Sequence, residues 1–197
     1  MKLTNILAVT AAALSIGAVA NANGGHVGLL AGSSSADFDC LESNFLDCVA
    51  VGDSNMFSGS VTEVGIFAGY RWNLPNFFVG VEAELSTAEY DLYATSNPYD
   101  VDTKRLKAQI GKSAGQFTYY GFLGISAVDI DRISSSYPLS GTGMSFGAGI
   151  EYDVTDNFGL RLEALMENVD VEHETQAISE DHEWSNRSVR VGAFAKF

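Results

Sequence analysis

Apolar and polar side chains alternate with a period of two along most of the chain. In residues 147–169, Ile150 and Leu162 share one face, whereas Glu151 and Arg161 share the other. A period of two is typical of β-strands, whose side chains point alternately to opposite faces. Eight segments show this alternation, with approximate limits 25–32, 60–72, 77–88, 104–112, 117–128, 143–153, 158–169 and 186–197. The pattern therefore predicts an all-β fold of eight strands.

The connections between these segments alternate in length. Three are short turns, at 73–76, 113–116 and 154–157. Four are longer, at about 33–59, 89–103, 129–142 and 170–185. Strands of roughly ten residues can cross a bilayer at a tilt, and bacterial outer-membrane barrels have short periplasmic turns and longer external loops. The sequence thus predicts an eight-stranded antiparallel up-and-down transmembrane β-barrel.

One face of the predicted strands is apolar, and its aromatic residues gather near the short turns. They are Tyr70, Trp72, Phe77, Phe117, Tyr119, Tyr152 and Phe158, with Phe197 at the same level. Such a girdle is expected where a barrel crosses the headgroup region, whereas a soluble core would distribute its aromatic residues. We therefore expect the apolar face to contact lipid. The alternative is a soluble carrier of the lipocalin type, with an apolar lumen and a charged exterior.

The opposite face combines charges of both signs with many glycines. The predicted lumen charges are Glu63, Arg71, Glu82, Glu84, Arg105, Lys107, Glu151, Arg161, Glu163, Glu167, Arg190 and Lys196, six acids and six bases. Eight strands enclose a space that side chains can just fill. We expect ion pairs to close this lumen, with the glycines leaving room for the long Glu and Arg side chains.

The chain has 197 residues, and its beginning has the features of an export signal. Lys2 precedes an apolar run that ends in Ala20-Asn21-Ala22, which predicts a cleaved signal peptide at 1–22 and a barrel domain at 23–197. In an exported protein, Cys40 and Cys48 are expected to form a disulfide.

The net charge of −14 argues against a nucleic-acid partner. The excess acids lie in the predicted long loops, where they form solvated surface or, alternatively, bind divalent cations. His173 and His182 lie near Ser179 in one such loop, but without the fixed spacing of a catalytic site. We predict no enzyme activity, no catalytic or metal-binding residue and no cofactor.

Three stretches carry a resemblance to a known family: IFAGYRWN (66–73), GAGIEYDVTDNFGLRLE (147–163) and SVRVGAFAKF (188–197). The chain resembles the small OmpA-like outer-membrane β-barrels, often called porin or opacity proteins. The resemblance implies the outer membrane of a Gram-negative cell, with membrane lipid and lipopolysaccharide as surroundings. It also implies that the barrel assembly machinery recognises the terminal aromatic residue, here Phe197, and the paired cysteines are similar to those of some members.

The sequence thus predicts a structural or surface-exposed barrel whose acidic external loops mediate adhesion or other contacts. One alternative is a narrow porin-like diffusion channel. Another is an outer-membrane enzyme that modifies lipid A.

Overall fold

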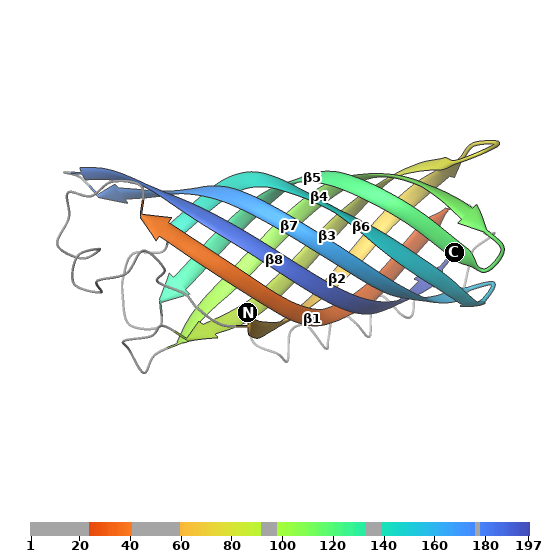
Figure 1. Ribbon diagram of the computed structural model, residues 1–197, viewed down its shortest axis with the longest axis horizontal. Helices are drawn as coiled ribbons and strands as arrows, with labels where there is room; N and C mark the ends of the chain where they lie inside the picture. Colours follow the sequence, from red (N-terminus) through yellow and green to blue (C-terminus); the bar gives the residue numbers. More distant parts are fainter. Residues whose placement is uncertain (1–23, 41–59, 92–97, 133–138, 176–177) are drawn as a thin grey trace.

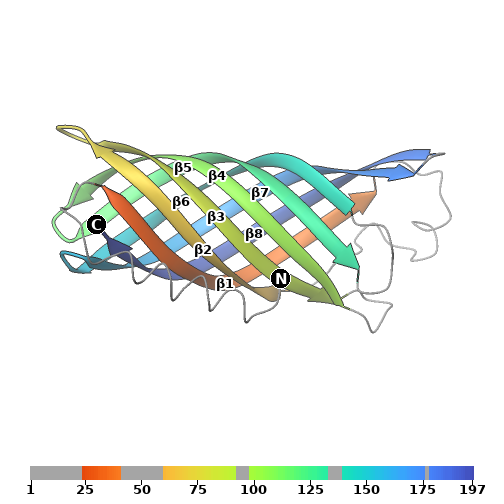
Figure 2. The ribbon, with the colours of Figure 1, turned by 180° about the vertical axis from the view of Figure 1, so that it is seen from behind.

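Eight antiparallel strands form a closed barrel in the computed structural model, which describes residues 24–40, 60–91, 98–132, 139–175 and 178–197 (Figure 1, Figure 2). The strands are β1 (Gly25–Cys40), β2 (Ser60–Asn73), β3 (Phe78–Asp91), β4 (Pro98–Ala114), β5 (Phe117–Arg132), β6 (Leu139–Thr155), β7 (Phe158–Thr175) and β8 (Ile178–Lys196). Each strand pairs with its neighbour in sequence, and β8 pairs with β1. The predicted fold class is confirmed. In the described part of the chain, no helix is long and apolar enough to span a membrane.

Two sequence predictions fall on residues that the structure does not describe. The signal peptide predicted at 1–22 lies outside the described residues. So does Cys48, the expected disulfide partner of Cys40. Both stay predictions.

The two ends of the barrel differ in their connections, and we call them the short-turn end and the long-loop end. At the short-turn end, β4 and β5 are joined by Gly115 and Gln116, and Gly115 has a φ of +64°, which favours glycine. The start of β1 meets the C-terminal residue here, since the Gly25 amide donates to the Phe197 carbonyl at 3.1 Å. The Phe197 amide donates back to the Gly25 carbonyl at 2.9 Å.

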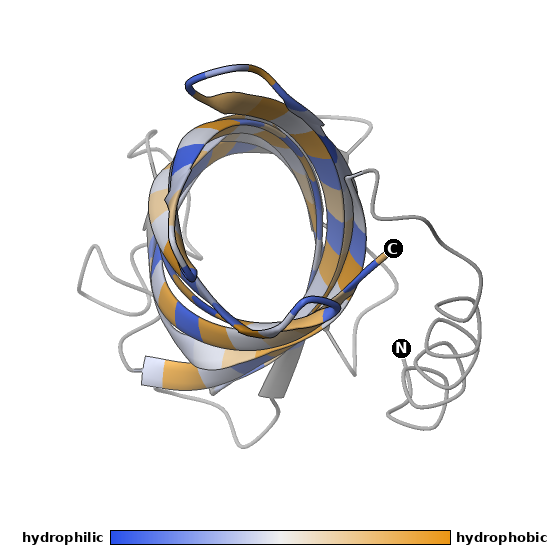
Figure 3. Cartoon of the chain, turned by 90° about the vertical axis from the view of Figure 1, so that its right-hand side faces the viewer, coloured by the Kyte–Doolittle hydropathy of each residue, from blue (hydrophilic) through white to orange (hydrophobic). Residues whose placement is uncertain are grey.

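The outward face near the short-turn end is a band of exposed apolar side chains, which we call the lipid band. Ile125 is 63% exposed, Val191 61% and Ile110 58%. The predicted girdle residues Tyr70, Trp72, Phe77, Phe117, Tyr119, Tyr152 and Phe158 are all exposed and belong to this band. The view along the barrel in Figure 3 shows hydrophobic and hydrophilic residues alternating along the strands.

The strands continue well beyond the limits predicted from sequence. β4 begins at Pro98 instead of about 104, and β8 begins at Ile178 instead of about 186. The predicted long loops 33–59, 89–103, 129–142 and 170–185 are therefore wrong in extent, because each contains several residues of strand. We call the strand ends on the long-loop side the extension, and it includes these additional segments and the inward apolar positions next to them, such as Val128.

The error has a physical reason. The alternation continues into the extension, but there the outward face becomes polar and the inward face becomes apolar. On β5, the outward residues Leu123 and Ile125 are apolar, and the outward Asp129 is charged. The inward Ser126 is polar, whereas the inward Val128 is apolar and fully buried. A search for apolar outward positions therefore stops where the outward face becomes polar.

The extension has an apolar core of its own inside the barrel. It consists of Ala36, Ala88, Tyr90, Val101, Val128, Ile130, Val169 and Trp184, with Val61 packed against them. Tyr90 and Trp184 meet edge to face, with their ring centroids 5.3 Å apart. Six of the eight strands contribute to this cluster and Val61 adds β2, so the cluster ties the strand ends together across the lumen.

Candidate functional site

Arg105 on β4 is the most highly connected cation in the lumen. It is 3% exposed, and its Nε and Nη2 donate to the two carboxylate oxygens of Glu167 at 2.9 and 2.8 Å. Its Nη1 donates to Glu63 at 2.9 Å and to Glu84 at 2.7 Å. These partners stand on β2, β3 and β7, so one guanidinium joins three other walls of the barrel.

Lys107 and Arg190 hold a second group of carboxylates. The Lys107 ammonium donates to Glu84 at 2.5 Å, to Glu163 at 3.1 Å and to Glu82 at 3.2 Å. Arg190 on β8 donates to Glu84 at 2.5 and 3.1 Å and also to Glu163. Because Glu84 accepts from Arg105, Lys107 and Arg190, it links the two groups.

The network continues toward the short-turn end through Arg161. Its guanidinium binds Glu82 at 3.0 and 2.8 Å and Glu151 at 2.9 and 2.7 Å. Glu151 is also gripped by Arg71, at 2.6 and 2.9 Å, and Arg71 in turn donates to Gln109. The carboxylates are thus held by bidentate, charge-assisted hydrogen bonds, which are stronger than neutral ones.

Eleven of the twelve charges predicted for the lumen belong to this connected network, and Lys196 does not. Lys196 is partly exposed at the short-turn end and pairs with Asp153 at 2.7 Å. His26, which the sequence analysis did not include, joins instead through its Nε2, 2.9 Å from Glu82. A cavity of about 210 Å³ lies at this end, with His26, Arg71, Glu151 and Lys196 among its lining residues.

Aromatic rings share the lumen with the charges, and the sequence analysis missed them. The Arg161 guanidinium lies 4.0 Å from the centre of the Phe67 ring, and the Lys107 ammonium lies 4.8 Å from that of Phe122. The Tyr120 hydroxyl donates to Glu163 at 2.7 Å. The sequence did contain a signal for them: along each strand, these rings fall on the same alternate positions as the inward charges and glycines. Cation–π contacts of this kind add to the ion pairs where water is excluded.

Several lumen glycines make room for inward aromatic rings, and at some of them a backbone oxygen of the neighbouring strand lies closer still. A Cβ at Gly111 would lie 2.6 Å from the Phe78 ring, and one at Gly147 would lie 2.6 Å from the Phe122 ring. Gly149 and Gly159 are likewise covered by Tyr120 and Phe194. The expectation that glycines leave room for Glu and Arg holds only at a few positions, such as Gly32 beside Arg190. A flat ring fills the space above a glycine more completely than a flexible charged chain, which explains the difference.

The charges of this network are buried, so they fill the lumen and do not line a water-filled channel. Glu82, Glu84, Lys107, Glu167 and Arg190 are each at most 1% exposed. Charges removed from water need close partners. Some partners here stand on neighbouring strands, as Glu82 and Lys107 do, and others reach across the lumen, as Arg190 does to Glu84. Among the described residues, no group of three or more His, Cys, Asp or Glu side chains is placed to hold a metal ion.

The candidate catalytic residues weighed from the sequence lie in the β7–β8 hairpin of the extension. The backbone register pairs His173 with Glu180, and it pairs His182 with Val171. Ser179 lies opposite Glu174. The backbone therefore does not set either histidine directly opposite the serine.

Comparisons with known proteins agree with this architecture. Residues 6–197 match the family described as the outer membrane protein beta-barrel domain. The chain belongs to this family, and its place is the outer membrane. A curated 22 kDa outer membrane protein from Rhizobium leguminosarum bv. viciae is 26% identical over 137 residues. That alignment covers 67% of this chain and 64% of the relative, so the chain matches less than two thirds of the relative's length.

Solved structures of two other outer-membrane proteins are similar to this chain at low sequence identity. The outer membrane protein OprG from Pseudomonas aeruginosa is 15% identical, with a TM-score of 0.57, covering 89% of this chain and 97% of that one. Neisserial surface protein A is 16% identical, with a TM-score of 0.49, covering 87% of this chain and 97% of that one. The likeness to OprG concerns the fold alone.

Proposed function

We propose that this member of the outer membrane protein β-barrel family is a closed barrel that acts through its exposed end and not through a pore. The observation that carries the proposal is the buried network around Glu84, which joins Arg105, Lys107 and Arg190 across the lumen. Ion flow would require these partners to separate, and separating a buried ion pair costs several kcal/mol. We therefore assign the barrel a structural or adhesive role.

The extension supports the second half of the proposal. In barrels of this type, long loops face outward from the cell. Outward residues Glu89, Asp100 and Asp170 give the extension an acidic surface above the lipid band. Its apolar core holds this surface rigid, because Trp184 and Val128 are almost fully buried. A rigid acidic surface suits contacts with basic patches on another cell or on a host surface.

Single-channel recording in planar bilayers tests the closed lumen. We expect no stable conductance steps from the wild-type protein. The double variant Glu84→Ala with Arg190→Ala removes both members of one ion pair and should raise the leak above the wild-type level. Large, stable conductance from the wild-type barrel would refute the closed lumen and favour the narrow diffusion channel.

The surface role is tested with cells that display the barrel. Asp100→Asn together with Asp170→Asn removes two outward charges without touching the lumen. Retention on matrix-coated surfaces should fall several-fold, and the loss should shrink at high salt because screening weakens surface charges. Thr142→Asn, an uncharged change on the same outward face, serves as the control. Equal retention of all three proteins would contradict an adhesive role for these acids.

A further inference from the structure

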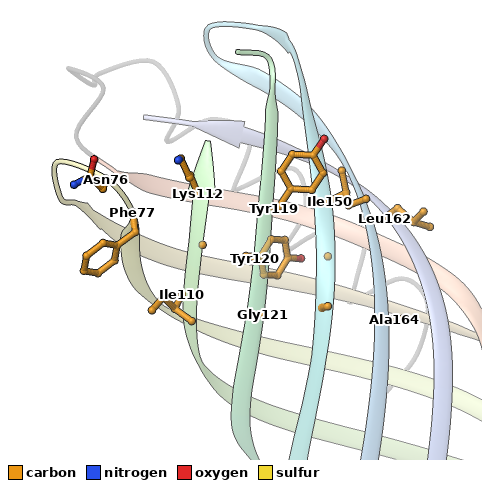
Figure 4. Close-up of a pocket in the computed structure, with 13 residues that line it drawn as sticks. Asn76, Phe77, Ile110, Lys112, Tyr119, Tyr120, Gly121, Ile150, Leu162 and Ala164 are labelled. Carbon is orange, nitrogen blue, oxygen red and sulfur yellow. The ribbon is translucent and has the colours of Figure 1, made fainter. Parts of the chain in front are cut away.

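A shallow groove of about 680 Å³ lies on the lipid-facing surface near the short-turn end (Figure 4). Its floor consists of small residues from three neighbouring strands, since Gly121 on β5 pairs with Ala148 on β6, which pairs with Ala164 on β7. Larger apolar side chains, among them Ile110 and Leu162, stand beside this floor. The groove is therefore an apolar recess within the lipid band.

Packing of the barrel does not explain the glycine in this floor. A Cβ added at Gly121 would meet only the Gly147 carbonyl oxygen, at an ordinary contact distance of 3.7 Å. By contrast, a Cβ at the nearby Gly149 would collide with the ring of Tyr120. Gly121 is thus dispensable for the fold, and what it provides is a hollow on the outer surface.

A cation stands at one end of the groove. Lys112 is exposed and lines the groove beside Tyr119, its register partner on β5. Figure 4 shows the polar ends of Lys112 and Tyr119 directed toward the short turns. Lys112 makes no ion pair with any residue that the structure describes. Aromatic girdles lie at the depth of the lipid headgroups, where the phosphates are. The groove therefore ends at Lys112, an unpaired cation at the depth of the lipid phosphates.

We propose that this groove holds one glycerophospholipid from the periplasmic leaflet of the outer membrane. An acyl chain lies over Gly121, Ala148 and Ala164, and the phosphate receives a charge-assisted hydrogen bond from the Lys112 ammonium. Dispersion contacts with a fitted chain favour one bound lipid over exchanging neighbours. The site is independent of the lumen, so it stands whether or not the barrel conducts.

Native mass spectrometry of the purified barrel in zwitterionic detergent tests the site, with phosphatidylglycerol and phosphatidylcholine as probes. The wild-type barrel should retain a single phosphatidylglycerol more strongly than any further lipid. Gly121→Leu fills the groove and should abolish this retention for both lipids. Lys112→Gln should weaken retention of phosphatidylglycerol about fivefold and leave phosphatidylcholine unchanged.

Two matched variants control for general effects on the lipid-facing surface. Ala83→Leu adds similar bulk to the lipid band on β3, outside the groove, and Lys104→Gln removes an exposed outward cation from β4, also outside the groove. Both should behave as wild type, and a heat-modifiability gel confirms that every variant is folded. Equal retention by wild type and Gly121→Leu would overturn the proposal. So would a wild-type dimer that Gly121→Leu dissociates, because the occupant would then be a second copy of the chain.

Discussion

The lipid band and the extension are built from the same strands with opposite polarity. In the lipid band of β5, Leu123 points outward, and the lumen inside the band holds buried charges such as Arg161 and Glu163. In the extension of the same strand, Asp129 points outward and Ile130 points into an apolar core. Backbone pairing runs without a break between the two, from Phe117 to Arg132.

The difference shows that the surroundings outside the barrel, not the strand geometry, decide what fills it. Next to water, burying apolar side chains inside is favourable, and the extension has the core of a soluble protein. Next to lipid, the outward face is already apolar, and hydrogen bonds and ion pairs inside the lumen hold the walls together. Each half therefore has its own source of stability, and each can be tested separately.

The largest effect is expected from Arg105→Met in the lumen. The variant leaves Glu63, Glu84 and Glu167 short of a buried partner, and breaking such a pair typically costs about 3–5 kcal/mol. Urea unfolding in lipid vesicles, followed by tryptophan fluorescence, measures the loss. Lys104→Met, one residue earlier on the outward face, is the control and should leave the unfolding midpoint unchanged. A midpoint shift of the same size in both variants would contradict a special role for the lumen network.

A cation placed on the outward face should be costly in the lipid band and harmless in the extension. Leu123→Arg puts a charge in the band and should cost about 2–4 kcal/mol of unfolding free energy. Thr142→Arg lies on the outward face of the extension, next to Asp170 in register, and should be nearly neutral. The same vesicle unfolding assay compares them. Equal destabilisation would mean that lipid covers the extension as well as the lipid band.

The sequence predicted the lipid band well because one physical rule governs it. Alternation with an apolar outward face identified the eight strands, the girdle residues such as Trp72 and the inward parity of charges such as Glu84. It did not predict the extension, because there the apolar residue, such as Val128, faces inward and the charged residue, such as Asp129, faces outward. Nor did it predict the partners of each charge, since Arg105 and Glu167 are 62 residues apart and meet only once the barrel closes. Inward rings such as Phe67 were missed because apolar residues were assigned outward.

A cavity in the extension core should loosen the extension and leave the lipid band intact. Val128→Ala removes two carbon atoms from a fully buried position, which costs about 2 kcal/mol including the cavity. Hydrogen exchange should accelerate at amides of 98–104 and 128–132, and amides in the lipid band should keep their protection. Exchange that rises uniformly along β5 would show that the two halves unfold as one unit.

The smallest effect concerns one hydroxyl in the extension core. The Ser34 hydroxyl donates to Asn186 at 2.7 Å, so the hydrogen bond of 3.0 Å between Ser34 and Tyr90 is donated by the Tyr90 hydroxyl. Tyr90→Phe removes this donor and should cost about 1 kcal/mol at neutral pH.

The pH dependence of this cost distinguishes a buried phenol from an exposed one. Burial raises the pKa of Tyr90 from 10.0 to about 12, so the folded protein keeps the phenol proton where the unfolded chain loses it. The stability that Tyr90 contributes is fully present below the unfolded pKa of 10.0 and is lost as the pH rises toward 12. The excess of unfolding free energy of wild type over Tyr90→Phe should therefore shrink over that interval and then change sign, because the loss exceeds the hydrogen-bond contribution. The absorbance of the folded wild type should show one tyrosinate step near the upper end of the interval that Tyr90→Phe lacks. If the absorbance difference between wild type and Tyr90→Phe appeared near pH 10 instead, Tyr90 would be in contact with water. The extension would then lack the dry core that distinguishes it from the lipid band.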